Sequence, residues 1–203
     1  MARWQRLRQA DAHMVLMRKD GEGSRRIDGE GVYLRAPELR DYQEWADLRE
    51  ASRNFLVPWE PTWAHDETSR GSYRYKLRRY AEDARDDRAH ALFVFREPDD
   101  VLVGGVTLSN IRRGVAQMAS LGYWAGQAHA GHGYITAAVR AVVRHAFEDL
   151  DLHRVEAACQ PDNMASRRVL DKAGFTQEGS AKAYLKINGR WRDHLLFGIV
   201  SGL

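Results

Sequence analysis

The stretch from Leu121 to Leu150 constrains the fold most strongly, because it joins three structural signals in one continuous segment. An alternating pattern typical of a strand ends at Tyr123-Trp124, and a glycine-bearing loop follows from Gln127 to Gly133. From Tyr134 onward, apolar residues recur three and four positions apart, which predicts an amphipathic helix with one buried face. That face comprises Ile135, Val139, Val142, Val143, Ala146, Phe147 and Leu150.

The start of this predicted helix has no Ser, Thr, Asp or Asn where a capping side chain would normally stand. Small residues surround it instead, namely Ala128, Ala130, Gly131 and Gly133. A free helix N-terminus offers converging N–H donors and the positive end of the helix dipole, which together suit a phosphate. The alternative is a tight strand-to-helix turn whose glycines serve backbone geometry alone. Thr136 breaks the dinucleotide-binding fingerprint, and the Gly-Lys-Ser/Thr of a Walker loop is absent.

A second segment, from Gln160 to Phe175, reads as a short helix with clear ends. Asn163 is placed to cap its N-terminus, and Gly174 is the expected left-handed residue after its C-terminus. Together, Gly-Tyr-Trp with Gly-His-Gly-Tyr-x-Thr and Asn-x-x-Ser-x-x-Val-Leu-x-Lys-x-Gly-Phe resemble the GNAT family of acetyl-CoA-dependent N-acetyltransferases. With Val-Pro-Trp-Glu-Pro-Thr at residues 57–62, the chain resembles the RimJ-like branch, which acetylates the N-terminal amine of a ribosomal protein. The resemblance covers residues 31–199.

The resemblance implies an α/β (α+β) GNAT fold, in which a mixed, mostly antiparallel sheet of about six to seven strands is splayed around acetyl-CoA. About four helices should flank this sheet. The sequence patterns agree with a single domain over residues 27–203. We expect strands at 32–35, 90–96, 101–110, 115–124 and 153–159, and a final hairpin of 183–187 with 190–200 through Asn188-Gly189. Helices are expected at 42–53, after an Asp41/Glu44 capping box, at 66–88, from 134 onward and at 163–173.

The resemblance also implies how acetyl-CoA is held. Backbone groups of the strand should pair with the pantetheine arm, and loop amides should hold the pyrophosphate. The family usually has Arg or Gln three residues before the first glycine, whereas this chain has Ala128, so the grip should depend on backbone donors and on Gln127. His129 and His132 could add charge; without a third ligand we expect no metal there. The implied set is Leu121, Gly122, Tyr123, Trp124, Gln127, Ala128, His129, Ala130, Gly131, His132, Gly133, Tyr134, Thr136, Asn163 and Ser166.

Acetyl transfer to an amine requires a neutral amine, a donor for the oxyanion and stabilisation of the leaving thiolate. By resemblance, Ser166 donates to the sulfur, and Asn163 either caps its helix or also bonds the pantetheine amide. The loop that carries Trp59, Glu60 and Trp63 walls the acceptor site, or its tryptophans simply plug the core. Glu60 is the leading candidate for the base, although a base acting through water is an equal alternative. Asp193 and His194 are adjacent in a predicted strand, so they face opposite ways and cannot form a relay.

Composition narrows the class of protein. The 203 residues are 44% hydrophobic and 29% charged, which is a globular balance. No apolar run approaches the roughly 18 residues of a membrane span, no secretory signal is visible, and the one cysteine rules out an internal disulfide. We therefore expect a cytoplasmic monomer or homodimer. The net charge of +3 is too small to argue for nucleic-acid recognition. Residues 1–26 form a basic extension that is either a tail or an added edge strand.

Three functions remain open from the sequence. The first is acetylation of a protein N-terminal α-amine, expected on a ribosomal protein, by direct attack in a ternary complex. The second is acetylation of a small amine, an aminoglycoside or a polyamine, which predicts an acidic acceptor pocket. The third is a non-catalytic CoA-binding or ribosome-associated protein, which predicts binding without turnover.

Overall fold

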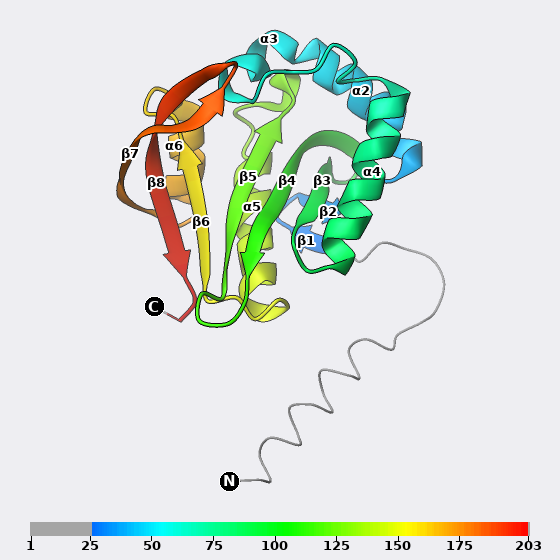
Figure 1. Ribbon diagram of the computed structural model, residues 1–203. Coiled ribbons are helices and arrows are strands. Elements are labelled where there is room, and N and C mark those ends of the chain that lie inside the picture. Colours follow the sequence, from blue (N-terminus) through cyan, green and yellow to red (C-terminus); the bar gives the residue numbers. More distant parts are fainter. Residues whose placement is uncertain (1–25, 203) are drawn as a thin grey trace, which may run out of the picture.

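The computed structural model describes residues 26–202, so the basic extension expected over residues 1–26 lies outside the described residues apart from Arg26. The described chain forms one eight-stranded sheet in the order β1-β2-β3-β4-β5-β6-β8-β7 (Figure 1). The β5–β6 pair is parallel and every other neighbouring pair is antiparallel. The strands are β1 Ile27–Gly29, β2 Val32–Arg35, β3 His90–Arg96, β4 Val101–Arg112, β5 Met118–Ala125, β6 Arg154–Cys159, β7 Thr176–Ile187 and β8 Arg190–Val200.

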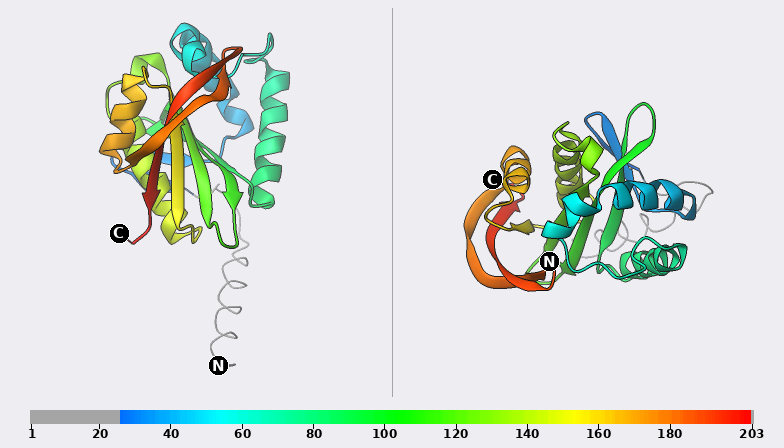
Figure 2. Two further views of the ribbon diagram at one scale, coloured as in Figure 1. Left: turned by 60° about the vertical axis from the view of Figure 1, so that its left-hand side comes forward. Right: turned by 90° about the horizontal axis from the view of Figure 1, so that it is seen from above.

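Helices cover both faces of the sheet (Figure 2). On one face, α2 (Tyr42–Ala51) and α4 (Arg70–Arg85) pack an aromatic cluster that includes Trp45 and Tyr73. On the other face, α5 (Tyr134–Glu148) and α6 (Met164–Lys172) cover the larger aliphatic core. The short helix α3 (Arg53–Leu56) leads into a 3-10 turn, Val57–Trp59. None of the helices within residues 26–202 combines the length and the apolar character needed to cross a membrane.

The expected GNAT fold is confirmed, with one strand and one helix more than the sequence patterns predict. The additional strand is β1, which pairs with β2. The additional helix arises because the first predicted helix breaks at Ser52, which leaves α3 as a separate turn. The hydroxyl of Ser52 accepts a hydrogen bond from the backbone N–H of Gln127 at 2.9 Å, so the break ties this corner to the glycine-bearing loop.

The Asp41/Glu44 capping box predicted before α2 is wrong. The Asp41 side chain makes no cap of that helix and instead accepts hydrogen bonds from Arg35 and from the backbone N–H of Glu38. Glu44 accepts a 2.7 Å hydrogen bond from the backbone N–H of Leu102 in β4. Both carboxylates therefore serve contacts outside the helix, which a local capping pattern cannot reveal.

Three other elements begin three or more positions from where the sequence predicts, and the largest difference is in β7, which is predicted from residue 183 but begins at Thr176. The helix predicted from residue 66 begins at Arg70, because Ser69 caps it by accepting a hydrogen bond from the Ser72 N–H at 3.1 Å. The strand predicted from Val115 begins at Met118, because Gln117 has a positive φ of 41° and Val115 is fully exposed. The turn into β5 is therefore longer than the residue pattern suggests.

Strands β5 and β6 separate partway along their length, as the family resemblance implies. Their parallel pairing runs from Met118 opposite Arg154 to Leu121 opposite Ala157 and then stops. Beyond that point, residues 122–125 pair with β4 alone, and residues 158–159 pair with β8 alone. The facing backbone edges of β5 and β6 thus open a gap in the middle of the sheet.

Candidate active site

A cavity of about 550 Å³ lies at the gap between β5 and β6. Its wall combines β5, the start of α5, α6, the 57–60 turn and the β7–β8 hairpin. Most of the predicted site residues line it, whereas Gln127, Ala128, His132 and Trp63 do not. The predicted residues that do are Trp59, Glu60, Leu121, Gly122, Tyr123, Trp124, His129, Ala130, Gly131, Gly133, Tyr134, Thr136, Asn163 and Ser166.

One end of the cavity is the N-terminus of α5. Gly133 occupies the N-cap position in the left-handed region with φ 88°, and no side chain caps the helix. Gly131 is also left-handed, with φ 83°. A Cβ built on either glycine meets no atom within 4 Å, so the space above this loop is open. The first helical N–H groups therefore face open space at the positive end of the helix, an arrangement that fits a pyrophosphate.

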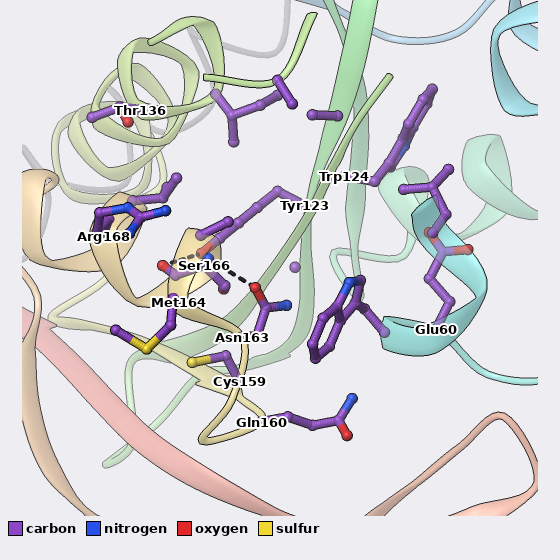
Figure 3. Close-up of a pocket in the computed structure, with 18 of the residues that line it drawn as sticks. Glu60, Tyr123, Trp124, Thr136, Cys159, Gln160, Asn163, Met164, Ser166 and Arg168 are labelled. Carbon is purple, nitrogen blue, oxygen red and sulfur yellow. Dashed lines mark hydrogen bonds between the residues drawn. The ribbon is translucent and has the colours of Figure 1, made fainter. Parts of the chain in front are cut away.

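Two cations that sequence reasoning missed lie on the same cavity. Arg168 and Lys172 are four residues apart on α6, so they share one face of that helix, and both line the cavity. In Figure 3, Arg168 lies on the side of Thr136, away from Glu60. Their i, i+4 spacing after Asn163 is a signal that the sequence did contain. Positive charge on this side suits a polyanionic co-substrate.

The unpaired edge of β5 forms the middle of the cavity wall. Residues 122–125 hydrogen-bond to β4 on one side and have no strand on the other, so amide groups of a bound chain can pair there. The strand edge and the helix N-terminus together match the two parts of coenzyme A, an amide-bearing arm and a pyrophosphate. The residues present therefore fit the group that the resemblance implies.

The far end of the β5 edge brings three polar side chains together. Asn163 caps α6 by accepting a hydrogen bond from the Ser166 N–H at 3.0 Å. The Tyr123 hydroxyl lies 2.7 Å from the Ser166 hydroxyl and 3.1 Å from the Ser166 carbonyl oxygen, to which it can donate (Figure 3). Burial raises the pKa of Tyr123 far above its ordinary value, so the phenol remains protonated. Sequence reasoning assigned Tyr123 only a backbone contact and missed this hydroxyl pair.

Cys159 also lines the cavity, although sequence reasoning gave it no role. It is buried at the end of β6, and desolvation raises the pKa of its thiol. The side chain is therefore a neutral part of the wall near Ser166 rather than a thiolate nucleophile.

The opposite side of the cavity is built on Glu60. Both of its carboxylate oxygens accept hydrogen bonds from Arg49, at 2.8 and 2.7 Å, and one also accepts from the Trp63 indole N–H at 2.7 Å. The Arg49 guanidinium is stacked on the rings of Trp63 and Trp124, 4.4 and 4.9 Å from their centroids. Trp63 therefore supports Glu60 from behind the cavity wall, while Trp59 and Glu60 face the cavity.

Distant segments fix the 57–60 turn from two further directions. The Gln160 side-chain amide donates to the carbonyl of Pro58 at 3.1 Å. At the tip of the β7–β8 hairpin, the backbone N–H of Asn188 donates to the carbonyl of Glu60 at 2.9 Å. Three separate parts of the chain thus hold this wall in place.

The remaining candidate residues fall outside a metal site. His129 lines the cavity, and burial and nearby Arg96 lower its pKa. His132 stacks on Tyr134 at 5.8 Å. Among residues 26–202, no group of three or more His, Cys, Asp and Glu side chains could hold a metal ion.

The sequence is similar to those of known acetyltransferases. Residues 32–176 match the family model described as Acetyltransferase (GNAT) domain. The chain is 39% identical over 175 residues to the probable N-acetyltransferase YjcK of Bacillus subtilis, an alignment that covers 86% of this chain and 97% of the relative. It is 31% identical over 176 residues to the [ribosomal protein uS5]-alanine N-acetyltransferase of Escherichia coli, which covers 87% and 91%.

The fold is also similar to those of acetyltransferases of known structure. Mycobacterium smegmatis RimJ in complex with CoA-disulfide superposes with a TM-score of 0.80 at 35% identity, over 88% of this chain and 85% of that one. The ribosomal-protein-S5-alanine acetyltransferase of Vibrio fischeri also gives a TM-score of 0.80, at 30% identity, over 87% and 96%. The open α5 terminus, the splayed strands and these matches establish that the chain belongs to the GNAT family and is an N-acetyltransferase that uses acetyl-CoA.

Proposed function

We propose that this enzyme acetylates the N-terminal α-amine of a protein, and that the acceptor is a ribosomal protein met in the cytoplasm. The observation that carries the proposal is the charge of the acceptor wall. Glu60 is the single carboxylate among the described residues that line the cavity, and its charge is already balanced by Arg49. A polycationic aminoglycoside or polyamine requires unpaired acidic groups, whereas a peptide N-terminus presents one amine. Relatives named [ribosomal protein uS5]-alanine N-acetyltransferase and ribosomal-protein-serine acetyltransferase support a ribosomal protein as the acceptor.

The reaction is direct attack of the amine on the thioester within a ternary complex. A C–N bond forms, the C–S bond breaks, one proton leaves the amine, and the departing thiolate is protonated. An α-amine has a reference pKa of about 7.7–8.0, so a modest base is sufficient to keep it neutral for attack. The free N–H groups at the start of α5 and the β5 edge hold the co-substrate, which supplies the activated acetyl group.

We assign the stabilisation of the leaving sulfur to Ser166. When the Tyr123 hydroxyl gives its single proton to the Ser166 hydroxyl rather than to the Ser166 carbonyl, the serine proton is free to hydrogen-bond the sulfur. Tyr123 is therefore a positioning residue and Ser166 the catalytic one. Glu60 has the opposite character: accepting a proton would require it to give up hydrogen bonds from Arg49. These contacts favour Glu60 as a group that shapes the acceptor wall over Glu60 as the base.

A thiol-release assay with acetyl-CoA tests the proposal. The acceptors are peptides that begin with Ala, Ser or Met, the same peptides with a blocked N-terminus, an aminoglycoside and spermidine. We expect turnover of free Ala or Ser peptides and none of the blocked peptides, which retain every side-chain amine. Turnover confined to the aminoglycoside or spermidine would overturn the α-amine assignment. Ser166→Ala should lower kcat and leave the Kd for acetyl-CoA within about twofold, and unchanged kcat would remove Ser166 from the mechanism.

A further inference from the structure

His194 is a buried, titratable residue that lines the cavity and has no role in the site as described so far. It lies on β8 and is 3% exposed. Its neighbour Leu195 pairs with Cys159, whose side chain belongs to the core beneath α5 and α6. Because side chains alternate along a strand, His194 projects to the other face of the sheet. Ser166 and His194 therefore reach one cavity from opposite faces of the sheet, on either side of the gap.

The hydrogen bond of the ring fixes its tautomer. His194 Nδ1 lies 3.0 Å from the carbonyl oxygen of Arg192. A carbonyl oxygen only accepts, so Nδ1 carries the hydrogen and donates it. In the neutral ring the lone pair is then on Nε2. Glu60, by comparison, has both oxygens engaged by Arg49. The one carboxylate that lines the cavity among the described residues is thus engaged. Of the two imidazoles that line the cavity, His129 lies in the loop before α5, so His194 is the one on the hairpin side with a lone pair to offer.

Strand β7 holds the ring in place through an irregular segment. The pairing of β7 with β8 shifts between Ala181 and Leu185. Asp193 secures this bulge by accepting the Ala183 N–H at 2.9 Å and an ion pair from Lys182 at 2.7 Å. Tyr184 lies in this bulge, and its ring packs edge-on against the His194 ring, with 5.8 Å between the two ring centroids.

Adjacent residues of β8 therefore have complementary roles. Asp193 faces away from the cavity and fixes the bulge, and the bulge orients His194. The Tyr184 ring packs against the imidazole, and the uncharged Gln160 and the Glu60 carboxylate that Arg49 balances line the same cavity. On the same strand, Asp193 acts electrostatically on His194 but is paired with Lys182, and Arg192 shares the face of His194 by strand alternation.

We propose that His194 is the general base, and that its Nε2 removes the proton from the acceptor amine directly or through one water. The C–N bond forms as this proton moves to Nε2, and the C–S bond breaks on the other side of the gap, where Ser166 stabilises the sulfur. The proposed base, His194, and the residue that stabilises the leaving thiolate, Ser166, thus lie on opposite faces of the sheet. The proposal rests on amine acetylation as proposed above, but not on which amine is the acceptor.

The kinetic test compares wild type with His194→Gln on the best acceptor of the panel, peptide or small amine. We expect kcat/KM at pH 7 to fall by roughly 10²–10⁴-fold, the range of general-base catalysis, while the Kd for acetyl-CoA changes by less than about twofold. The deficit should shrink as the pH rises past the pKa of the amine, because a deprotonated acceptor needs no base. Imidazole added to His194→Gly should restore part of the rate. A peptide-only or polyamine-only panel result changes the acceptor class without deciding the base.

Two controls make the test specific. His153→Gln removes an exposed imidazole that lies outside the cavity wall, and it should leave both the rate and the pH profile unchanged. Glu60→Gln should keep the fall in kcat/KM that wild type shows at low pH, even if KM for the acceptor rises. If His194→Gln keeps that low-pH fall and a rate within about threefold of wild type, the proposal is overturned, and loss of both in Glu60→Gln would reassign the base to Glu60.

A measurement that needs no turnover checks the tautomer. Nitrogen-15 NMR of the wild-type protein with labelled histidine should show a neutral His194 ring protonated at Nδ1. The corresponding signals should be absent in His194→Gln. A ring protonated at Nε2 in its neutral form would overturn the proposal, whatever acceptor the enzyme uses.

Discussion

The two halves of the cavity are built in different ways. The co-substrate half is built mainly from backbone groups of residues close in sequence, namely the left-handed glycines before α5 and the open edge of β5, to which Arg168 and Lys172 of α6 add charge. The acceptor half consists of side-chain contacts between distant segments, such as Gln160 with Pro58, 102 residues apart. A site built from backbone groups is kept when the side chains around it change, which suits a co-substrate that many enzymes share. A side-chain-built wall can differ from one enzyme to the next, so we infer that acceptor choice is encoded there.

The largest expected effect comes from breaking the Arg49–Glu60 pair. The Arg49 side chain is 8% exposed, and Arg49→Met would leave Glu60 partly buried with no opposite charge. We expect a loss of about 3 kcal/mol of unfolding free energy, the low end for a broken buried pair. For a domain of this size that lowers the melting temperature by roughly 6–12 °C, measured by calorimetry.

The double variant R49M/E60Q is the control for this prediction. It removes both charges, so most of the stability lost in Arg49→Met should return, while KM for the acceptor stays raised and KM for acetyl-CoA is unaffected. Losses that simply add would show that Arg49 acts through its stacking on Trp63 and Trp124 rather than through Glu60. An equal rise in both KM values would contradict the separation of the two halves.

The sequence predicted several caps and turns correctly because their signals are local. Asn163 caps α6 as expected, Gly174 is left-handed with φ 91°, and Asn188-Gly189 forms the hairpin turn with φ values of 42° and 77°. Each of these depends on residues within a few positions of one another. The uncapped start of α5 could be read in the same way, from the capping residue that is absent.

The side-chain contacts that build the acceptor half could not be predicted, because they depend on the finished fold. Outside the cavity, Glu44 shows the same limit: it fits a local capping pattern but bonds Leu102, 58 residues away. The sequence suggested Glu60 as the leading candidate for the base, and only the packing of α2 brings Arg49 to it. The alternation of β8 correctly placed Asp193 and His194 on opposite faces, but it could not show which face meets the cavity.

An intermediate effect is expected at the glycines before α5. Gly133→Ala places a Cβ in the left-handed region at a cost of about 1–2 kcal/mol. If the chain relaxes to avoid this cost, the N–H groups at the helix start turn away, and KM for acetyl-CoA should rise roughly tenfold, equivalent to about 1.4 kcal/mol. Steady-state kinetics and chemical denaturation measure the two effects.

Gly114→Ala is the matched control for Gly133→Ala. Gly114 is also left-handed, with φ 66°, and has no atom within 4 Å of a built Cβ, but it lies in the turn between β4 and β5 outside the cavity wall. The stability loss should be similar, with KM unchanged. A similar KM rise in both variants would mean that general destabilisation, rather than the anion site, weakens acetyl-CoA binding.

The smallest expected effect distinguishes two roles for Asn163. Asn163→Ala and Ser69→Ala each remove a helix cap, and each should cost about 1 kcal/mol of stability. Only the first should lower kcat, because α6 carries Ser166 whereas α4 carries no cavity residue. Asn163→Ser then separates the roles, since it restores a capping oxygen without the amide N–H₂. Recovery of both stability and kinetics would make Asn163 a cap alone, whereas recovered stability with a raised KM for acetyl-CoA would show that its amide also contacts the co-substrate.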